Sequence, residues 1–195
     1  MSGDPLSMPR RTLSRRLVMS LPLLGTLAVG AGFYALLERM REGRYDPHEV
    51  DNPLVGRPVP SFPPLPAQPP AVEGFGAGDI RALHRPLLVN FFASWCQPCR
   101  VEHPALMALA PDLLIWGVAY KDTAEAVRAL LAESGNPYRR IGRDADGRAA
   151  IEWGVYGVPE TFLIDANGII RGHWAGPLDP DVIEGELKPL LARAG

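Results

Sequence analysis

The second half of the chain alternates between apolar runs and polar, turn-forming segments. Residues 87–93 and 113–119 are continuous apolar runs, which are typical of strands buried on both faces of a sheet. Residues 161–165 and 169–174 are two further strand patterns, and the Asn-Gly turn between them favours a hairpin. The remaining predicted elements are a short strand over residues 138–141 and helices over residues 78–84, 98–109, 123–134, 147–153 and 180–191.

This order of elements predicts an α/β fold. Helices that connect successive strands make those strands parallel and cover both faces of the resulting sheet. The closing hairpin adds antiparallel pairing, so the central sheet is expected to be mixed. The predicted domain occupies residues 71–195.

A charge-free segment near the N-terminus predicts a transmembrane helix. Residues 17–37 contain no charged side chain. As a helix, this segment would span roughly 31 Å, about the thickness of the hydrocarbon layer of a membrane. Four arginines between residues 10 and 16 precede it, and positive residues stay on the cytoplasmic side. Residues 1–16 are therefore predicted to be cytoplasmic, residues 17–37 to form the anchor, and the rest of the chain to be exported.

Two other interpretations of residues 17–37 remain open. A cleaved signal peptide is one, with Ala28-Val29-Gly30 as a small-residue cleavage site, although the apolar run is longer than usual. A buried core helix is the other, but the segment is apolar on all faces and follows a basic cluster. We therefore favour the membrane anchor.

Residues 38–70 form a proline-rich connection between the predicted anchor and the domain. The eight prolines between residues 53 and 70 oppose regular helix and favour extended backbone. Such a segment holds a domain away from the bilayer. Within it, residues 54–62 are expected to lie along the domain as an ordered lead-in.

Composition fits a folded domain and excludes one class of partner. The chain is 47% apolar, which is enough for a core, and its net charge is −2. Residues 1–44 carry seven arginines against three acidic residues, whereas the rest of the chain carries 13 basic and 19 acidic residues. An acidic domain argues against nucleic acid as a partner, because phosphate binding needs clustered lysine and arginine.

Cys96 and Cys99 are the only cysteines in the sequence, and they stand where the first buried strand gives way to a helix. Two thiols at this spacing can cycle between dithiol and disulfide. The start of a helix favours a thiolate, so we assign Cys96 as the exposed nucleophile and Cys99 as the thiol that resolves the mixed disulfide. Trp95 and Pro98 are expected to shape and shield the pair. Together with the predicted sheet, this motif indicates a thioredoxin-like fold.

Residues 157–161, Gly-Val-Pro-Glu-Thr, form the second element of the candidate site. In a thioredoxin-like fold, Pro159 is expected to follow a cis peptide bond and to face the cysteines. The backbone of Val158 is then free to pair with an extended substrate chain. Tyr156 is a candidate for the same substrate groove, or for simple packing. Without the cysteine pair, Pro159 would be interpreted as an ordinary loop proline.

Other uses of the two cysteines fit the sequence less well. A zinc site needs four ligands, and His103 is the one further candidate nearby. Covalent haem needs a histidine directly after the second cysteine, where this chain has Arg100. A copper site would need a distant ligand such as His173. A purely structural disulfide across so short a loop would stabilise the fold little.

Around these motifs the sequence resembles the CcmG/DsbE group, the membrane-anchored periplasmic thioredoxins of cytochrome c maturation. The likeness extends over the anchor, the lead-in and the domain. The segments that carry it are residues 88–104 with Trp95-Cys96-Gln97-Pro98-Cys99, residues 119–122, 135–138, 154–165 with Gly-Val-Tyr-Gly-Val-Pro-Glu-Thr-Phe, 167–171 and 187–190.

The resemblance implies a dithiol reductase without an organic cofactor, because the cysteine pair itself carries the electrons. Its substrate would be a disulfide in the haem-attachment motif of apocytochrome c, or in a partner thiol protein that handles it. Electrons would arrive through a membrane thiol transporter of the DsbD or CcdA kind. The chain would be a single-pass protein of the bacterial inner membrane, with its catalytic domain in the oxidising periplasm.

One difference from ordinary thioredoxins concerns acid–base chemistry. Those proteins carry a buried aspartate six residues before the first cysteine, where this chain has Asn90, which cannot accept a proton at neutral pH. Glu102 and Glu160 flank the cysteines in the family-like segments and are candidates to replace it. We favour Glu160 for this role. The alternative is that both are ordinary surface acids.

Three other functions remain open at the level of sequence. The first is a general periplasmic thiol–disulfide oxidoreductase unrelated to cytochromes, which a reduction potential would classify as reductase or oxidase. The second is a copper-binding assembly factor, which a metal assay on the reduced protein would detect. The third is a membrane-tethered scaffold whose cysteine pair is incidental.

Overall fold

The computed structural model describes residues 25–35, 37–38, 52–69 and 73–194 of the chain. By its contacts the chain divides into two compact units, Met1–Glu49 and Val50–Gly195. In the first unit, residues 25–35 and 37–38 are helical. The rest of the predicted anchor at 17–37, and all of residues 1–16, lie outside the described residues. Within the described part, no helix is long and apolar enough to cross a membrane, so the anchor stays a prediction.

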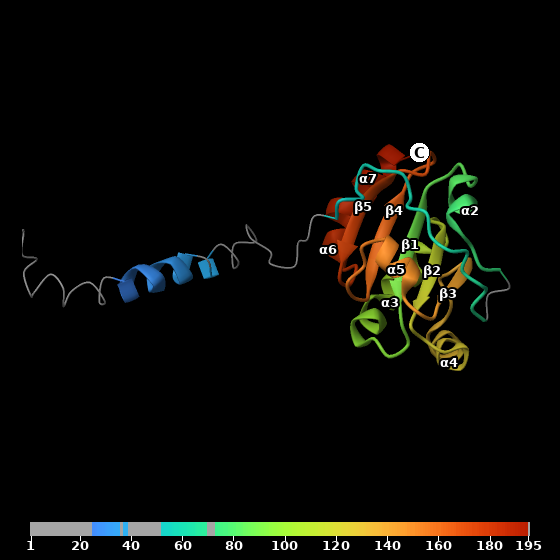
Figure 1. Cartoon of the computed structure of the whole chain (residues 1–195), viewed down its shortest axis with the longest axis horizontal. Helices are drawn as coiled ribbons and strands as arrows, with labels where there is room; N and C mark the ends of the chain where they lie inside the picture. Colours follow the sequence, from blue (N-terminus) through green and yellow to red (C-terminus); the bar gives the residue numbers. More distant parts are fainter. Residues whose placement is uncertain (1–24, 36, 39–51, 70–72, 195) are drawn as a thin grey trace, which may run out of the picture. The chain divides into compact units, whose positions relative to one another are not determined.

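A mixed five-stranded sheet forms the centre of the second unit, which confirms the predicted α/β class (Figure 1). The strands lie in the order β3-β2-β1-β4-β5. The first three are parallel, and the last two run antiparallel to their neighbours. Their bounds are β1 Leu87–Phe92, β2 Ile115–Tyr120, β3 Arg140–Asp144, β4 Glu160–Ile164 and β5 Ile170–Ala175.

Helices and the lead-in cover the sheet on both faces, as the alternation along β1 shows. Leu88 and Phe92 point into one apolar cluster, whereas Val89 and Phe91 point into the other. The first cluster is completed by α3 (Gln97–Leu109), α4 (Ala124–Ser134) and the C-terminal run of α6 (Pro180–Val182), the π-helix η1 (Ile183–Leu187) and α7 (Lys188–Ala194). The second is completed by α2 (Ala77–Arg81), α5 (Arg148–Glu152) and the lead-in.

The lead-in, which in the structure extends over residues 52–69 rather than 54–62, is part of the folded unit and pairs with both edges of the sheet (Figure 1). At the β5 edge, the Gly56 N–H donates to the Ile170 carbonyl over 2.8 Å. At the β3 edge, the Gln68 N–H donates to the Ile141 carbonyl, also over 2.8 Å. Between the two edges, Phe62 is buried against the second cluster. The compact unit therefore begins well before residue 71, where the sequence placed the domain boundary.

Several elements differ from their predicted bounds by one to three residues, and two of these differences have identifiable reasons. Strand β3 begins two residues later than expected, because pairing with the lead-in at Ala67 and with β2 sets its register, rather than its own alternation. The C-terminal helix includes the π-helical turn η1, which a pattern of apolar residues does not reveal.

Candidate active site

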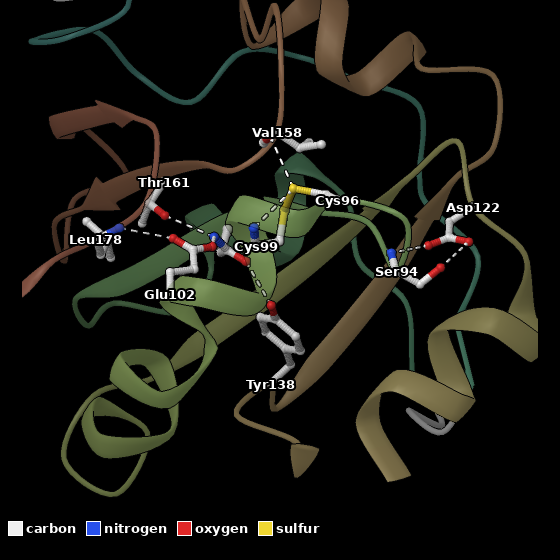
Figure 2. Close-up of a disulfide and its surroundings, with 10 residues drawn as sticks. Ser94, Cys96, Cys99, Glu102, Asp122, Tyr138, Val158, Thr161 and Leu178 are labelled. Atoms are coloured by element: carbon white, nitrogen blue, oxygen red, sulfur yellow. Dashed lines mark hydrogen bonds between the residues drawn. A yellow bond between two sulfur atoms is a disulfide. The ribbon is translucent and has the colours of Figure 1, made fainter. Parts of the chain in front are cut away.

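The cysteine pair lies at the N-terminal end of α3, directly after the central strand β1 (Figure 2). Cys96 is the N-cap of α3, and a disulfide bond joins it to Cys99. The expectation that Cys96 is exposed was wrong for this disulfide form, in which both cysteines are buried at the apolar cluster under α3. The Cys99 N–H donates to the Cys96 Sγ over 3.1 Å. Pro98 fits in this first turn because its missing N–H has no helical partner to lose. Unpaired N–H groups at a helix start stabilise a thiolate, so the geometry supports Cys96 as the nucleophile.

A carboxylate from the loop after β2 fixes the turn that presents Cys96 (Figure 2). Asp122 accepts from the Ser94 N–H over 2.5 Å and from the Ser94 hydroxyl over 3.0 Å. The Trp95 indole N–H points to the Lys121 carbonyl at 3.4 Å, and the Trp95 side chain remains 60% exposed. No local sequence pattern predicted that Asp122 holds this turn, because the contact joins residues 28 positions apart.

The loop before β4 faces the disulfide, as predicted for Pro159. The Val158–Pro159 peptide bond is cis. The Val158 carbonyl oxygen lies 3.3 Å from the Cys96 Sγ, and the Gly176 N–H donates to the Pro159 carbonyl over 2.9 Å. Tyr156, two residues before Val158, is 60% exposed. The structure thus places one exposed aromatic side chain, Trp95, on the segment that carries the reacting sulfur. It places a second, Tyr156, on the loop beside that sulfur.

Glu102 is buried on α3, one turn beyond Cys99. Its Oε1 accepts from the Asn90 side-chain amide over 2.9 Å, and its Oε2 accepts from the Leu178 N–H over 3.2 Å (Figure 2). Burial raises the pKa of the Glu102 carboxyl to about 7, against the lowering effect of these two hydrogen bonds. A carboxyl with this pKa can both take up and release a proton near neutral pH.

Asn90 links Glu102 to two further buried side chains. The Tyr138 hydroxyl donates to the Asn90 Oδ1 over 2.8 Å, and the Asn90 Nδ2 also lies 3.0 Å from the Thr161 hydroxyl. Burial and the nearby charge of Glu102 raise the pKa of Tyr138 well above its usual value. The sequence did not predict this network. The alternation of β1 could have placed Asn90 on the face of Leu88 and Phe92, but its partners come from distant elements.

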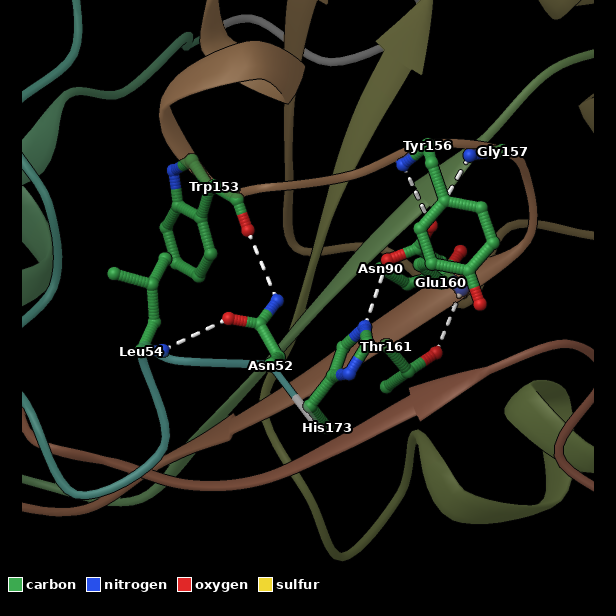
Figure 3. A network of polar contacts seen from close by, with 9 residues as sticks. All are labelled: Asn52, Leu54, Asn90, Trp153, Tyr156, Gly157, Glu160, Thr161 and His173. Carbon is green, nitrogen blue, oxygen red and sulfur yellow. Dashed lines mark hydrogen bonds and ion pairs between the residues drawn. The ribbon is translucent and has the colours of Figure 1, made fainter. Parts of the chain in front are cut away.

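Glu160 lies on the opposite face of the sheet from the disulfide. Its neighbour Thr161 contacts Asn90, and successive residues of a strand face opposite sides (Figure 3). The Glu160 Oε1 accepts from the N–H groups of Tyr156 and Gly157 over 2.9 and 3.1 Å. Its Oε2 lies 2.7 Å from the His173 Nε2. The acid–base role that we favoured for Glu160 from the sequence does not fit this position, and Glu102 fits it instead.

The two histidines considered as metal ligands have other contacts. The His103 Nε2 lies 3.1 Å from the Gly135 carbonyl, and His173 contacts Glu160 across the sheet from the cysteines. Neither histidine forms a set of possible metal ligands with the two cysteine sulfurs. Among the described residues, no group of three or more histidine, cysteine, aspartate or glutamate side chains is arranged to hold a metal ion.

This fold and this cysteine pair define a thioredoxin-like thiol:disulfide oxidoreductase, and comparison with known proteins agrees. The model of the AhpC/TSA family matches residues 55–173. The thiol:disulfide interchange protein HelX of Rhodobacter capsulatus is 44% identical over 90% of this chain and 96% of its own length. DsbE of Escherichia coli K12 is 42% identical over 90% of this chain and 94% of its own length.

The solved structures lead to the same class. A crystal structure of a DsbE candidate from Chlorobium tepidum has a TM-score of 0.59 and 27% identity, and it matches 72% of this chain and 98% of that one. The chain therefore belongs to the CcmG/DsbE family of thiol:disulfide interchange proteins, within the broader AhpC/TSA family.

Proposed function

We propose that this protein is a periplasmic dithiol reductase of cytochrome c maturation. Its substrate is a disulfide in the haem-attachment motif of apocytochrome c, or in a partner thiol protein that handles that motif. The observation that carries the proposal is the position of Cys96, at the start of α3 and 3.3 Å from the Val158 carbonyl, with Glu102 buried one turn beyond Cys99. Membership of the CcmG/DsbE family supports the choice of pathway.

The exchange proceeds in two steps that balance in atoms and electrons. The Cys96 thiolate attacks one sulfur of the substrate disulfide, so a mixed disulfide forms and the other substrate sulfur leaves as a thiolate. Cys99 then attacks the Cys96 Sγ, which re-forms the protein disulfide and releases the second substrate sulfur. The protein dithiol is oxidised by two electrons, and the substrate disulfide is reduced to two thiols.

Glu102 has the position and the pKa to take the proton that Cys99 loses in the second step. It lies on the buried side of α3 with Cys99, and its pKa of about 7 lies close to neutral pH. Asn90 cannot replace it, because an amide does not accept a proton at this pH. The Leu178 N–H and the Asn90 amide both stabilise the ionised carboxylate once the proton has moved on.

The substrate chain docks in extended form beside the loop that contains Val158. Exposed backbone groups of such a loop pair with an extended chain, as an added strand does at a sheet edge. Trp95 and Tyr156, both 60% exposed, provide apolar contact on either side. Pro98 is also exposed, in the first turn of α3, and limits access to the two cysteines, which are both buried.

The cellular setting belongs to the same proposal. Residues 17–37 anchor the chain in the inner membrane, residues 1–16 stay in the cytoplasm, and the catalytic domain works in the periplasm. The arginine cluster before the apolar segment supports this orientation. Electrons reach Cys96 and Cys99 from a membrane thiol transporter of the DsbD or CcdA kind. An alkaline phosphatase fused after residue 195 should be active in cells, and an inactive fusion would contradict the orientation.

The substrate is tested with the reduced full chain in detergent and an oxidised peptide that contains Cys-x-x-Cys-His. We expect rapid reduction of the peptide by the unaltered protein and none by Cys96→Ala. Cys99→Ala should instead accumulate a mixed disulfide between Cys96 and the peptide. A peptide in which serine replaces the first cysteine, and which therefore holds no internal disulfide, is the control. A haem-motif peptide that reacts no faster than oxidised glutathione would contradict the proposed substrate.

A further inference from the structure

We infer that His173 is a positioning residue for substrate binding, which acts through Glu160 on the loop beside Cys96. The inference rests on the proposed reduction of a disulfide in an extended chain. It assigns a role to a buried histidine on β5 that takes no part in the exchange chemistry itself. The chain of contacts runs from His173 to Glu160 and from Glu160 to the backbone of residues 156 and 157 (Figure 3). Val158 is the next residue of that loop.

The first link is the Glu160 carboxylate, which binds the loop through one of its oxygens and His173 through the other. Its Oε1 accepts two backbone N–H groups, from Tyr156 and Gly157, and so fixes two consecutive peptide units of the loop. Glu160 itself is 1% exposed and belongs to β4, whose pairing with β1 and β5 holds it in place. The loop is thus tied to a rigid part of the sheet through one side chain.

The second link is His173, which provides the partner for the other carboxylate oxygen. Its Nε2 lies 2.7 Å from the Glu160 Oε2, and its side chain is 4% exposed. The imidazole ring packs on Phe162, with ring centres 4.5 Å apart, so its orientation is set by packing as well. A buried carboxylate oxygen without a donor is costly, and Glu160 would then leave this position or lose its hold on the loop.

The third link joins the loop to the reacting sulfur. Val158 directly follows the two residues that Glu160 holds, and its carbonyl oxygen lies 3.3 Å from the Cys96 Sγ. Loss of the His173 contact should therefore weaken the docking of an extended chain. It should leave the thiols unchanged, because the helix start and Glu102 lie on the other face of the sheet.

The test compares three variants of the full chain in detergent. His173→Phe keeps a ring on Phe162 but removes the donor, whereas His173→Gln restores an N–H near the position of Nε2. Arg171→Gln is the matched control, because it removes a cation of β5 that pairs with Asp165 and not with the loop. The protein starts fully reduced and reacts once, and the measurements are the saturating single-turnover rate and the half-saturating peptide concentration, called kcat and KM below. They are made for two oxidised peptides of equal length, one with the haem motif and one unrelated. They also include the rate with a small aromatic disulfide, the reduction potential and the melting temperature.

We expect His173→Phe to raise KM for both peptides about tenfold, which is the usual effect of losing a hydrogen bond to a charged group. Its kcat, its rate with the small disulfide and its reduction potential should stay within about twofold of the unaltered protein, and His173→Gln should recover most of the change in KM. Arg171→Gln should leave KM unchanged even if it melts earlier.

Either of two results would overturn the inference: an unchanged KM in His173→Phe, or an equal loss of reaction with the peptides and with the small disulfide. If His173→Phe does not fold, Glu160→Ala replaces it, again with Arg171→Gln as the control. Glu160→Ala removes the acceptor of the two loop N–H groups and should raise KM, and an unchanged KM would contradict the inference. If the unaltered protein reacts equally well with the two peptides, that result contradicts the proposed haem-motif substrate but not the role of His173.

Discussion

The side-chain amide of Asn90 on β1 donates a hydrogen bond to the carboxylate of Glu102 on α3 over 2.9 Å. The strand therefore carries an amide where ordinary thioredoxins carry an aspartate, and the carboxyl comes from the helix that also carries both cysteines. Although the carboxyl comes from a different element, a titratable carboxyl remains on the disulfide face of the sheet. It also makes the properties of Glu102 depend on Asn90 and, through it, on Tyr138.

Glu102→Gln should change how the exchange rate depends on pH. Because the pKa of Glu102 is raised to about 7, the ionised form that accepts a proton from Cys99 is depleted below that pH. The unaltered protein should therefore lose activity toward the peptide as the pH falls below about 7, and the variant should lack this inflection and be slower by roughly 10²-fold at neutral pH. Glu133→Gln, on the exposed surface of α4, is the control. An inflection retained in Glu102→Gln would assign it to another group.

The same pKa predicts a pH dependence of stability. The folded state binds the Glu102 proton more tightly than the unfolded state does, because the pKa rises from 4.5 to about 7 on folding. The stabilising contribution is complete below pH 4.5 and is lost as the pH rises through 7. Relative to the unaltered protein, Glu102→Gln should gain about 2 kcal/mol in free energy of unfolding between about pH 5 and pH 8. Urea unfolding at both pH values measures this difference, and a constant difference would contradict it.

Tyr138→Phe should destabilise the fold and disturb Glu102. The ring would still stack on Phe92, where the ring centres lie 4.6 Å apart, but the Asn90 Oδ1 would lose its donor in a buried site. The cost should be about 1–2 kcal/mol in the free energy of unfolding. Tyr120→Phe, in which the ring contact with Trp95 is kept, should cost less than about 0.5 kcal/mol. Equal effects of the two substitutions would exclude the network as the cause.

Removal of the lead-in should unfold the domain. A chain that starts at residue 71 lacks Phe62 and Leu65, which are buried against the sheet, and leaves both sheet edges unpaired. We expect a chain over residues 50–195 to fold and a chain over residues 71–195 to aggregate, as circular dichroism and light scattering would show. Phe62→Ala in the longer chain should cost about 3 kcal/mol. A shorter chain that melts cooperatively at the same temperature as the longer one would contradict this role.

The sequence predicted elements whose burial follows a simple period. Strand β1 is buried at every position, and its apolar run marked it to within one residue. Helix α4 lies between Thr123 and Gly135, whose capping signals are local. Prediction was less successful where a partner distant in sequence sets the structure. The lead-in shows no periodic pattern of apolar residues, because prolines dominate it. Its pairing with β3 and β5 depends on backbone N–H and carbonyl groups, which do not distinguish one sequence from another.

The candidate site shows the same division. Cys96, Cys99 and Pro159 were predictable because their chemistry depends on spacing and on the adjoining strand. The choice between Glu102 and Glu160 depends on which face of the sheet each one meets. The register of β4 decides which face each residue meets, because Thr161 faces Asn90 and the adjacent Glu160 faces away from it. Contacts such as Asp122 with Ser94 depend on loops meeting in three dimensions, which no local pattern encodes.

The reduction potential of the Cys96–Cys99 pair tests the central claim most directly. It can be measured on the full chain by equilibration with a thiol buffer of known potential, with the fraction of disulfide read by mass after alkylation. A dithiol reductase that works against the oxidising periplasm should have a potential clearly more negative than about −200 mV. A value near about −120 mV would describe an oxidant and would contradict the proposed role in cytochrome c maturation.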